Sequence, residues 1–203
     1  MKIRENRVLI ATTNLGKLEE FKRILETPRC TFVGLDEFPQ IKFPPEGQSY
    51  FENARIKART AARQTGLVSV ADDSGLEVLA LGGRPGPLSA RYGGPGLSDF
   101  ERSAYLLSEL ETLGSVSRLA RFVCVAALAI PDGPSFTEKG TCRGVLLQEA
   151  SGTRGFGYDP LFVPEGHERS FAEFSKNEKN QISHRGIAHR AIRAYLRKES
   201  FLS

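Results

Sequence analysis

Two adjacent carboxylates at the end of an apolar run are the feature that most constrains how this chain can fold. Residues 67–71 (Leu-Val-Ser-Val-Ala) form a short apolar run, which predicts a buried strand. Residues 72–75 (Asp-Asp-Ser-Gly) follow directly. Carboxylates beside a buried strand lose hydration unless a cation or hydrogen-bond donors hold them, and the glycine allows a sharp turn or a close approach to a ligand. The segment is therefore either a ligand site or an ordinary turn before a return strand over residues 76–81.

The composition is that of a globular protein with an anionic partner. Its 203 residues predict a single domain over residues 1–203, in two lobes. The formal net charge of +4 suits an anion, but lysine and arginine form no dense block, so a nucleotide and a nucleic acid both remain open.

The cysteines and the apolar runs bear on where the protein works. Cys30, Cys124 and Cys142 are far apart and show no metal-ligand spacing, which predicts thiols in a reducing compartment. No apolar run reaches membrane-spanning length, and the N-terminus has no apolar signal core. We therefore expect a cytoplasmic protein without a membrane partner.

The N-terminal segment has the order strand, polar loop, helix. Residues 7–11 are β-rich, residues 18–25 have helical spacing, and Thr12 to Lys17 lie between them. Backbone N–H groups at a helix N-terminus and a lysine together form an anion site, although the spacing of a Walker A loop is absent. The alternative is a plain helix cap by Thr13 or Asn14 with a solvated Lys17.

The central segments predict further strands and helices. A proline-rich loop over residues 38–47 carries Glu46, either as a solvated charge or as a ligand of a metal shared with Asp73. Helices with Ser-x-x-Glu capping boxes are expected from Ser49 to Thr65 and from Ser98 to about residue 113. Strands are expected over residues 31–35, 121–130 and 135–147, the last two as a hairpin.

The C-terminal third combines glycines, aromatics and cations. Phe156, Gly157, Tyr158 and Asp159 lie in a glycine-rich loop, where a ring can stack on a base or pack into the core. A third capping box at Ser175 opens a short helix that carries Lys179, and a last helix runs from residue 183 to about residue 198. His184 and Arg185 fall in its first turn, where the dipole disfavours cations, so they serve an anionic or polar ligand or lie at a solvated helix start.

These pieces together suit metal-assisted phosphoryl chemistry. Mg²⁺ binds a few carboxylate oxygens together with phosphate oxygens and water, and it neutralises phosphate charge while orienting a water molecule. A nearby carboxylate can accept the proton of that water. The carboxylates of residues 72 and 73 and the basic, glycine-containing loops supply these parts.

Six motifs give the chain a specific resemblance. In order they are Ala11-Thr-Thr-Asn-Leu-Gly-Lys17, Glu52-Asn-Ala-Arg-Ile-Lys-Ala58, Ala71-Asp-Asp-Ser-Gly-Leu76, Ser89-Ala-Arg-Tyr92, Gly155-Phe-Gly-Tyr-Asp-Pro160 and Ile182-Ser-His-Arg-Gly186. With these motifs the chain resembles the inosine triphosphate pyrophosphatase family over nearly its whole length. The resemblance implies an α/β fold: a long mixed central sheet flanked by helices, with two lobes and the active site in the cleft between them.

The resemblance also implies an activity. Members hydrolyse noncanonical purine nucleoside triphosphates (ITP, dITP, XTP) to the monophosphate and pyrophosphate, which cleanses the nucleotide pool, and they are typically Mg²⁺-dependent homodimers. The expected partner is a nucleotide and not a nucleic acid. Two alternatives are a Maf-type nucleotide pyrophosphatase, against which residues 156–159 and 183–186 argue, and a basic nucleic-acid-binding protein, against which the paired carboxylates argue.

Site residues follow from the matching motifs. The resemblance implies that Asp73 is the proton acceptor and a metal ligand. It implies that the nucleotide is bound by Thr12, Thr13, Asn14, Leu15, Gly16, Lys17, Ser74, Phe156, Gly157, Tyr158, Asp159, Lys179, His184 and Arg185. The family commonly has a metal-binding glutamate two residues before the glycine that corresponds to Gly47; here Pro45 occupies that position and Glu46 lies one residue later. Glu46 is expected as the second metal ligand through a shifted loop, or else the metal relies on Asp73 and Asp72.

Overall fold

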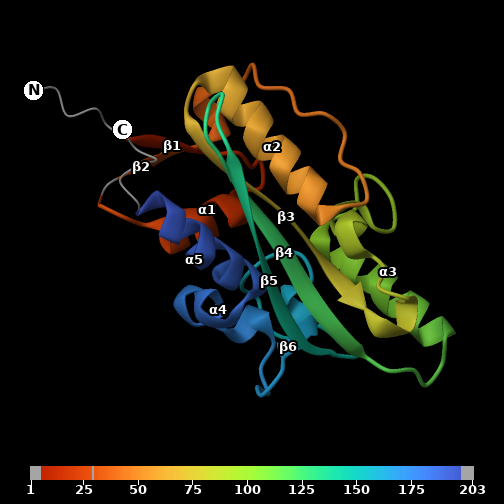
Figure 1. The fold of residues 1–203 in the computed structure, drawn as a ribbon. Helices are drawn as coiled ribbons and strands as arrows, with labels where there is room; N and C mark the ends of the chain where they lie inside the picture. The colour runs from red at the N-terminus through yellow and green to blue at the C-terminus, as the bar shows by residue number, and fades with distance from the viewer. Residues whose placement is uncertain (1–5, 29, 198–203) are drawn as a thin grey trace, which may run out of the picture. The chain divides into compact units, whose positions relative to one another are not determined.

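The protein is a mixed α/β structure built on one six-stranded sheet. A computed structural model describes residues 6–28 and 30–197, and the strand order is β2-β1-β3-β4-β5-β6 (Figure 1). The chain forms two compact units: unit 1 comprises residues 1–73, 124–140 and 185–203, and unit 2 comprises residues 74–123 and 141–184. The expected α/β class with a mixed sheet is confirmed.

Parallel strands organise unit 1. β1 (Arg7–Ile10) pairs in parallel with β2 (Thr31–Val33) and with the first part of β3 (Val68–Val78). Parallel neighbours need crossover connections, which α1 (Leu15–Leu25) and α2 (Tyr50–Thr65) provide. Since helices then cover both faces of the sheet, the three apolar residues of β1 (Val8, Leu9 and Ile10) are fully buried.

The two faces of this sheet have different cores. One face packs against α1 and α5 (His184–Leu196) through Phe21, Leu25 and Ile192. The other face packs against the alanine-rich side of α2, with Ala54, Ala58, Ala61 and Ala62 (Figure 1). These small side chains allow the α2 backbone to approach the strands closely. Successive residues of β3 point to opposite faces of the sheet, so they meet a different helix on each face.

Capping residues set the helix ends as the sequence indicates. Ser49 caps α2 by accepting the Glu52 amide, and Gly66 ends it with φ of 69° in the left-handed region that favours glycine. Full capping boxes form at Ser98 and Ser175. The expected box at Ser49 forms only in part, because the Glu52 carboxylate pairs with Arg55.

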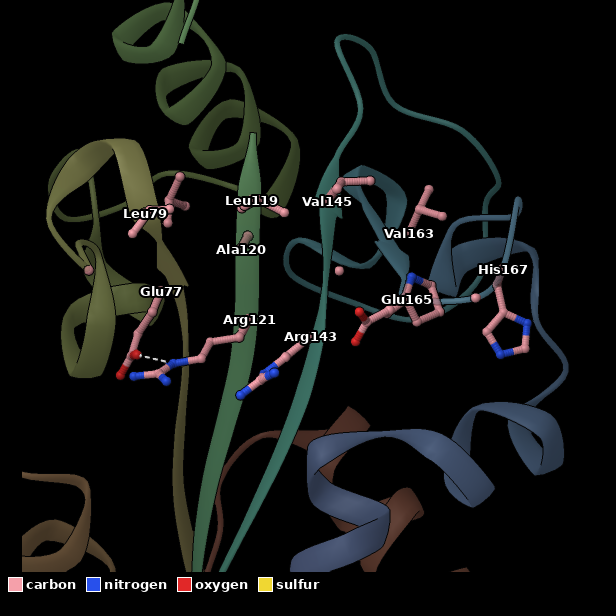
Figure 2. Close-up of a pocket in the computed structure, with 15 residues that line it drawn as sticks. Glu77, Leu79, Leu119, Ala120, Arg121, Arg143, Val145, Val163, Glu165 and His167 are labelled. Carbon is pink, nitrogen blue, oxygen red and sulfur yellow. Dashed lines mark hydrogen bonds and ion pairs between the residues drawn. The ribbon is translucent and has the colours of Figure 1, made fainter. Parts of the chain in front are cut away.

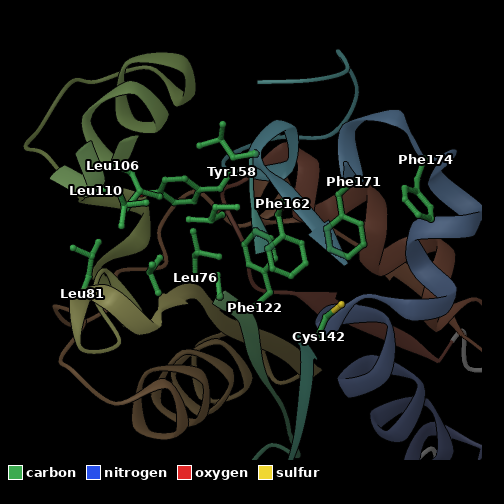
Figure 3. Packing of buried hydrophobic residues seen from close by; sticks show 14 residues of the cluster. Leu76, Leu81, Leu106, Leu110, Phe122, Cys142, Tyr158, Phe162, Phe171 and Phe174 are labelled. Carbon is green, nitrogen blue, oxygen red and sulfur yellow. The ribbon is translucent and has the colours of Figure 1, made fainter. Parts of the chain in front are cut away.

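Unit 2 holds its own hydrophobic core. It contains α3 (Asp99–Thr112), α4 (Lys176–Ile182), β6 (Phe162–Pro164) and the ends of β4 (Leu119–Ala129) and β5 (Ser135–Leu146). β5 and β6 are antiparallel. Leu106 and Leu110 of α3 belong to a cluster whose aromatic centre is formed by Phe122, Phe162 and Phe171 (Figure 3). Within residues 6–28 and 30–197 there are also five short 3₁₀ helices, at residues 35–37, 79–81, 86–91, 159–161 and 171–173.

The acidic segment is where the turn interpretation proves wrong. β3 continues from Val68 through Asp72, Asp73, Ser74 and Gly75 to Val78, and residues 79–81 form a 3₁₀ helix instead of the end of a return strand. Gly75 allows a close approach within unit 2, because a Cβ there would lie 2.0 Å from the Gly86 carbonyl oxygen.

Other boundaries shift by a few residues. α1 begins at Leu15, three residues before the expected start, and α5 ends at Leu196; the expected end near residue 198 lies outside the described residues. The predicted hairpin is confirmed, with β4 and β5 adjacent in the sheet. In the part of the chain that the structure describes, no helix has the length and apolarity needed to cross a membrane.

Candidate functional site

The loop after β1 presents polar groups beside the start of α1. Asn14 caps the helix, its Oδ1 accepting the Lys17 amide at 2.9 Å, and the Thr12 hydroxyl accepts the Asn14 amide at 3.2 Å. Thr13, Asn14 and Leu15 are exposed. The cap expected as the alternative to an anion site is therefore present, and it leaves the loop accessible from solvent.

Asp72 is the centre of a buried charge network on the α1/α5 face. Its Oδ1 accepts Lys17 Nζ at 2.7 Å, and its Oδ2 accepts Arg185 Nε at 2.9 Å and the Cys124 thiol at 3.4 Å. Arg185 also donates to Glu20 Oε2 at 2.5 Å. Arg185 is 2% exposed and Asp72 is 2% exposed, so water contributes little to holding these charges.

Opposite charges keep this network ionised. Burial alone would raise the pKa of Asp72, but Lys17 and Arg185 hold it well below its usual range. Burial alone would lower the pKa of Arg185, whereas Asp72 and Glu20 raise it. Charges buried together in this way depend on each other, since loss of one partner leaves an uncompensated charge.

His189 adds a neutral group beside the same carboxylate. It lies one helical turn after Arg185, it is fully buried, and Nε2 is 4.0 Å from Asp72 Oδ2. Burial lowers the pKa of His189 to about 3, and neither ring nitrogen has a hydrogen-bond partner among the described residues. The imidazole packs against Phe21, with ring centroids 3.9 Å apart.

Three possible metal-ligand atoms lie within 4.8 Å of one another in unit 1, from Asp72, Cys124 and His189. The spacing of the cysteines in the sequence did not predict this cluster. A thiol and an imidazole suit softer ions such as zinc, whereas Mg²⁺ prefers oxygen ligands. Asp72 is also already paired with two cationic side chains. This triad therefore does not fit magnesium.

Asp73 lies on the other face of β3, toward α2. Asn53 Nδ2 donates to Asp73 Oδ2 at 2.8 Å, and Lys57 Nζ lies 3.5 Å from Oδ1. Asn53 also binds the backbone of Gly47, accepting its amide at 2.8 Å and donating to its carbonyl at 3.0 Å. Asn53 thereby ties the proline-rich loop to the carboxylate of β3.

Glu46 shares a cation with Asp73. Lys57 Nζ donates to Glu46 Oε1 at 2.8 Å and is the same ammonium that approaches Asp73. Asp73 is 4% exposed, whereas the Glu46 side chain is 34% exposed. One carboxylate is thus fixed on a strand and the other is presented from a loop, with a positive charge that contacts both.

The negative charge of the buried Asp73 carboxylate is only partly compensated by its neighbours. Burial raises the pKa of Asp73 above its usual range, although Lys57 and Asn53 act in the opposite direction. Burial would lower the pKa of Lys57, but Asp73, Asp72 and Glu46 raise it overall. A carboxylate with a raised pKa is a better proton acceptor than an ordinary one.

Unit 2 carries a second buried ion pair beneath an aromatic ring. Lys179 Nζ donates to Asp159 Oδ2 at 2.6 Å, and the two residues are 4% and 3% exposed. The ammonium lies 4.8 Å from the Phe156 ring centroid, within the range of a cation–π contact. Phe156 itself is only half-buried.

Backbone geometry shapes this part of unit 2. Asp159 Oδ2 also accepts the Phe156 amide at 2.9 Å. A Cβ on Gly155, whose φ is 78°, would lie 2.1 Å from that same oxygen, so only glycine fits. Gly157 donates its amide to Asp99, and Tyr158 donates its hydroxyl to the Ser89 carbonyl at 3.1 Å. His184 is buried and its ring stacks on Phe122 at 4.6 Å.

Comparison with known proteins gives the family. A family model described as the Ham1 family matches residues 8–195. A dITP/XTP pyrophosphatase of Streptomyces avermitilis is 47% identical over 189 residues, covering 92% of this chain and 94% of that protein. One of Thermus thermophilus is 47% identical over 191 residues, covering 94% and 91%. A HAM1 protein from Coxiella burnetii has a similar structure, with a TM-score of 0.84 at 40% identity over 94% of this chain and 98% of that one.

This chain belongs to the Ham1 family. The expected relationship to the nucleotide pyrophosphatases is thereby confirmed, since the matched Ham1 range includes all six motifs that carry the resemblance.

The predicted site residues of this Ham1 protein fall into two groups. Unit 1 brings Lys17 and Arg185 together at Asp72, and Glu46 and Asp73 together at Lys57. Residues 12–14 form the loop before α1, and Leu15 and Gly16 begin that helix. Unit 2 brings Phe156, Asp159 and Lys179 together, and it also contains Ser74, Gly157, Tyr158 and His184.

Sequence reasoning missed several residues that the site uses. Asn53 and Lys57 entered the sequence analysis only as members of the motif Glu52–Ala58, without a role; their spacing of four residues was the available signal. The same spacing relates Arg185 to His189. Glu20 and Cys124 gave no local signal, because their roles depend on Asp72, which is distant in sequence.

A hollow of about 710 Å³ lies on an exposed face of the sheet in unit 2 (Figure 2). It is bordered by Leu79, Leu119 and Val145 and by Arg121 and Arg143. None of the predicted nucleotide-binding residues lines it. The hollow is therefore a different surface from the one that the sequence motifs indicate.

Proposed function

We propose that this protein hydrolyses noncanonical purine nucleoside triphosphates (ITP, dITP, XTP) to the monophosphate and pyrophosphate. The observation that carries the proposal is the Asp73 environment: a buried carboxylate with a raised pKa, fixed by Asn53 beside Glu46 and Lys57. The names of the Streptomyces and Thermus relatives, dITP/XTP pyrophosphatase, support the same reaction. Its role is to remove deaminated purines from the nucleotide pool.

Mg²⁺ is the proposed cofactor, held by Asp73 and Glu46. The fit rests on two carboxylates that already share one cationic neighbour and on the oxygen-only character of this pair, which suits magnesium. Asn53 supports the shifted loop by binding Gly47, next to Glu46. The ion, when bound, neutralises phosphate charge and orients water.

Asp73 is the proposed proton acceptor, and Asp72 is not. The Asp73 carboxylate has a raised pKa, so it can take a proton from an attacking water molecule, a contribution that is worth about 10²- to 10⁴-fold in rate. Asp72 is held in its ionised form by Lys17 and Arg185. Its role is to position Lys17 beside the loop of residues 12–14.

The phosphates are assigned to the start of α1, and the base is assigned to the ring of Phe156. Residues 12–17 offer backbone amides, hydroxyls and a lysine at a helix N-terminus, which attract anions, and Ser74 adds a hydroxyl. The half-buried ring of Phe156 is assigned to stack on the base, and Gly157, Tyr158, Asp159, Lys179 and His184 are assigned to bind the same nucleotide. Arg185 is assigned a positioning role, because its guanidinium is directed at Asp72 and Glu20.

Specificity follows from hydrogen-bond character. The 6-oxo group of hypoxanthine or xanthine is an acceptor, whereas the 6-amino group of adenine is a donor. A pocket that presents a donor to this edge leaves the amino group of ATP unsatisfied, and such buried mismatches can discriminate by about 10⁴-fold. GTP shares the 6-oxo group and is harder to exclude in this way.

A homodimer is proposed through the exposed sheet face of unit 2. Leu119 is 51% exposed and Val145 is 41% exposed, and the same hollow is lined by groups of both charges, such as Arg143 and Glu165 (Figure 2). A two-fold interface requires such a self-complementary patch. Leu119→Lys should give a monomer in light scattering, while Phe100→Lys, at an exposed position of α3, should not; an unchanged dimer in both would exclude this face.

We also propose that the protein acts in the cytoplasm, where nucleoside triphosphates are used. All three cysteines are among the described residues and none is in a disulfide, which supports a reducing compartment.

The test is pyrophosphate release from ITP, XTP, GTP, ATP and dTTP, with and without Mg²⁺. We expect Mg²⁺-dependent release from ITP and XTP far above ATP, lost in Asp73→Asn. Release that peaks on dTTP would favour a Maf-type enzyme, and no release from any nucleotide would overturn the proposal.

A further inference from the structure

Lys57 occupies a distinctive position between the two proposed metal ligands. Its ammonium is 2.8 Å from Glu46 Oε1 and 3.5 Å from Asp73 Oδ1. The side chain is only 15% exposed, and it projects from α2, which is fixed against the sheet by its alanine face. The ammonium is thus held at this place by a rigid element.

The contacts of Lys57 are those expected of a cation shared by two carboxylates. Like charges brought together in a buried place repel unless a positive charge lies between them. Asp73 and Glu46 are brought together in this way, since both contact the same Lys57 ammonium, at 3.5 Å and 2.8 Å. Lys57 relieves this repulsion without any ion from solution.

We propose that Lys57 is a built-in substitute for the metal ion: its ammonium holds Glu46 and Asp73 together in the metal-free protein, and a divalent cation must displace it to bind both carboxylates. This proposal rests on the assignment of Glu46 and Asp73 as the metal site. It adds a positioning residue, because Lys57 sets the geometry and the affinity of that site.

Two consequences distinguish this role from that of an ordinary surface lysine. Metal affinity is lowered by Lys57, because two cations compete for the same oxygens. The stability of the wild-type protein depends little on Mg²⁺, because Lys57 already neutralises the pair. Without Lys57 the carboxylates need the ion, so stability becomes dependent on metal.

The experiment compares wild type with Lys57→Met, which keeps an unbranched side chain one atom shorter and removes its charge. Mn²⁺ binding in the absence of nucleotide, measured by calorimetry or electron paramagnetic resonance, should tighten by at least about tenfold, equivalent to about 1.4 kcal/mol. The melting temperature of Lys57→Met in chelator should fall below that of wild type, and Mg²⁺ should restore most of the loss. Adding Asp73→Asn to the variant should abolish this rescue.

Arg55→Met is the matched control. Arg55 is a cation on the same helix that pairs with Glu52 instead of Asp73, so its loss should leave metal affinity and metal rescue unchanged. If Lys57→Met does not fold in chelator, refolding in Mg²⁺ but not in its absence would support the proposal. Unchanged or weaker Mn²⁺ binding by Lys57→Met, or an equal Mg²⁺ effect on the melting temperature of wild type, would overturn it. Neither readout uses nucleotide hydrolysis, so the proposal can fail or hold independently of the proposed reaction.

Discussion

The neighbouring carboxylates Asp72 and Asp73 lie on opposite faces of β3 in unit 1, and their surroundings have opposite effects on their pKa values. On the α1/α5 face, Asp72 contacts two cations and a thiol, and its pKa is well below its usual range. On the α2 face, Asp73 contacts one amide and one distant ammonium, and its pKa is raised. Both residues are almost fully buried, so burial does not distinguish them.

The difference lies in the supply of positive charge. Asp72 is neutralised by cations on two helices and cannot easily give or take a proton. Asp73 and Glu46 contact the same Lys57 ammonium, so one positive charge serves two carboxylates. A carboxylate whose charge is balanced by two cations stabilises the structure. A carboxylate whose charge is only partly balanced is suited to bind a metal and accept a proton.

The largest effect is expected from exchanging each carboxylate for an amide. Asp72→Asn leaves Arg185 and Lys17 without their shared partner, and breaking a buried pair should lower the free energy of unfolding by about 3 to 5 kcal/mol. Asp73→Asn should not lower it, because the raised pKa shows that ionisation of Asp73 disfavours the folded state. Urea unfolding at neutral pH measures both. Equal losses in the two variants would contradict the comparison.

The next effect concerns the far end of the network on the α1/α5 face. Glu20→Gln removes the charge that faces Arg185 at 2.5 Å. Hydrogen bonds to charged groups contribute about 1.5 to 3 kcal/mol, so we expect a loss of unfolding free energy in that range. Glu19→Gln, at the exposed preceding residue, is the matched control and should change stability little. A similar loss of unfolding free energy in both variants would show that Glu20 acts through the overall charge of α1 and not through Arg185.

The smallest effect is a pH dependence specific to the α1/α5 face. The pKa of His189 is lowered from 6.5 to about 3, so between these values the unfolded chain binds a proton that the folded protein does not. Stability contributed by neutral His189 is therefore lost as the pH falls below about 6.5, by up to about 1.4 kcal/mol per pH unit. Urea unfolding at pH 6.5 and pH 5 measures this slope. His189→Leu should reduce it; an unchanged slope would assign the pH dependence to other groups.

Local patterns predicted much of the architecture. The capping residues Ser49, Ser98 and Ser175 and the terminal Gly66 marked helix boundaries correctly, because a cap is a contact between residues three or four positions apart. The β4–β5 hairpin was equally readable from its turn. The turn interpretation of residues 72–75 was wrong. Asp, Ser and Gly favour turns locally, but the tertiary structure supplies the partners that keep these residues in a strand.

The sequence by itself determined the α/β class, the helix caps, the family motifs and the presence of acidic residues beside cationic loops. Only the tertiary structure decided that Asp72 is paired with two cations, whereas Asp73 shares one cation with Glu46. Adjacent residues of a strand point to opposite faces, and the cations that reach Asp72 come from 55 and 113 residues away along the chain. Charge compensation over such separations depends on which helix covers which face of the sheet, and no local spacing encodes that arrangement.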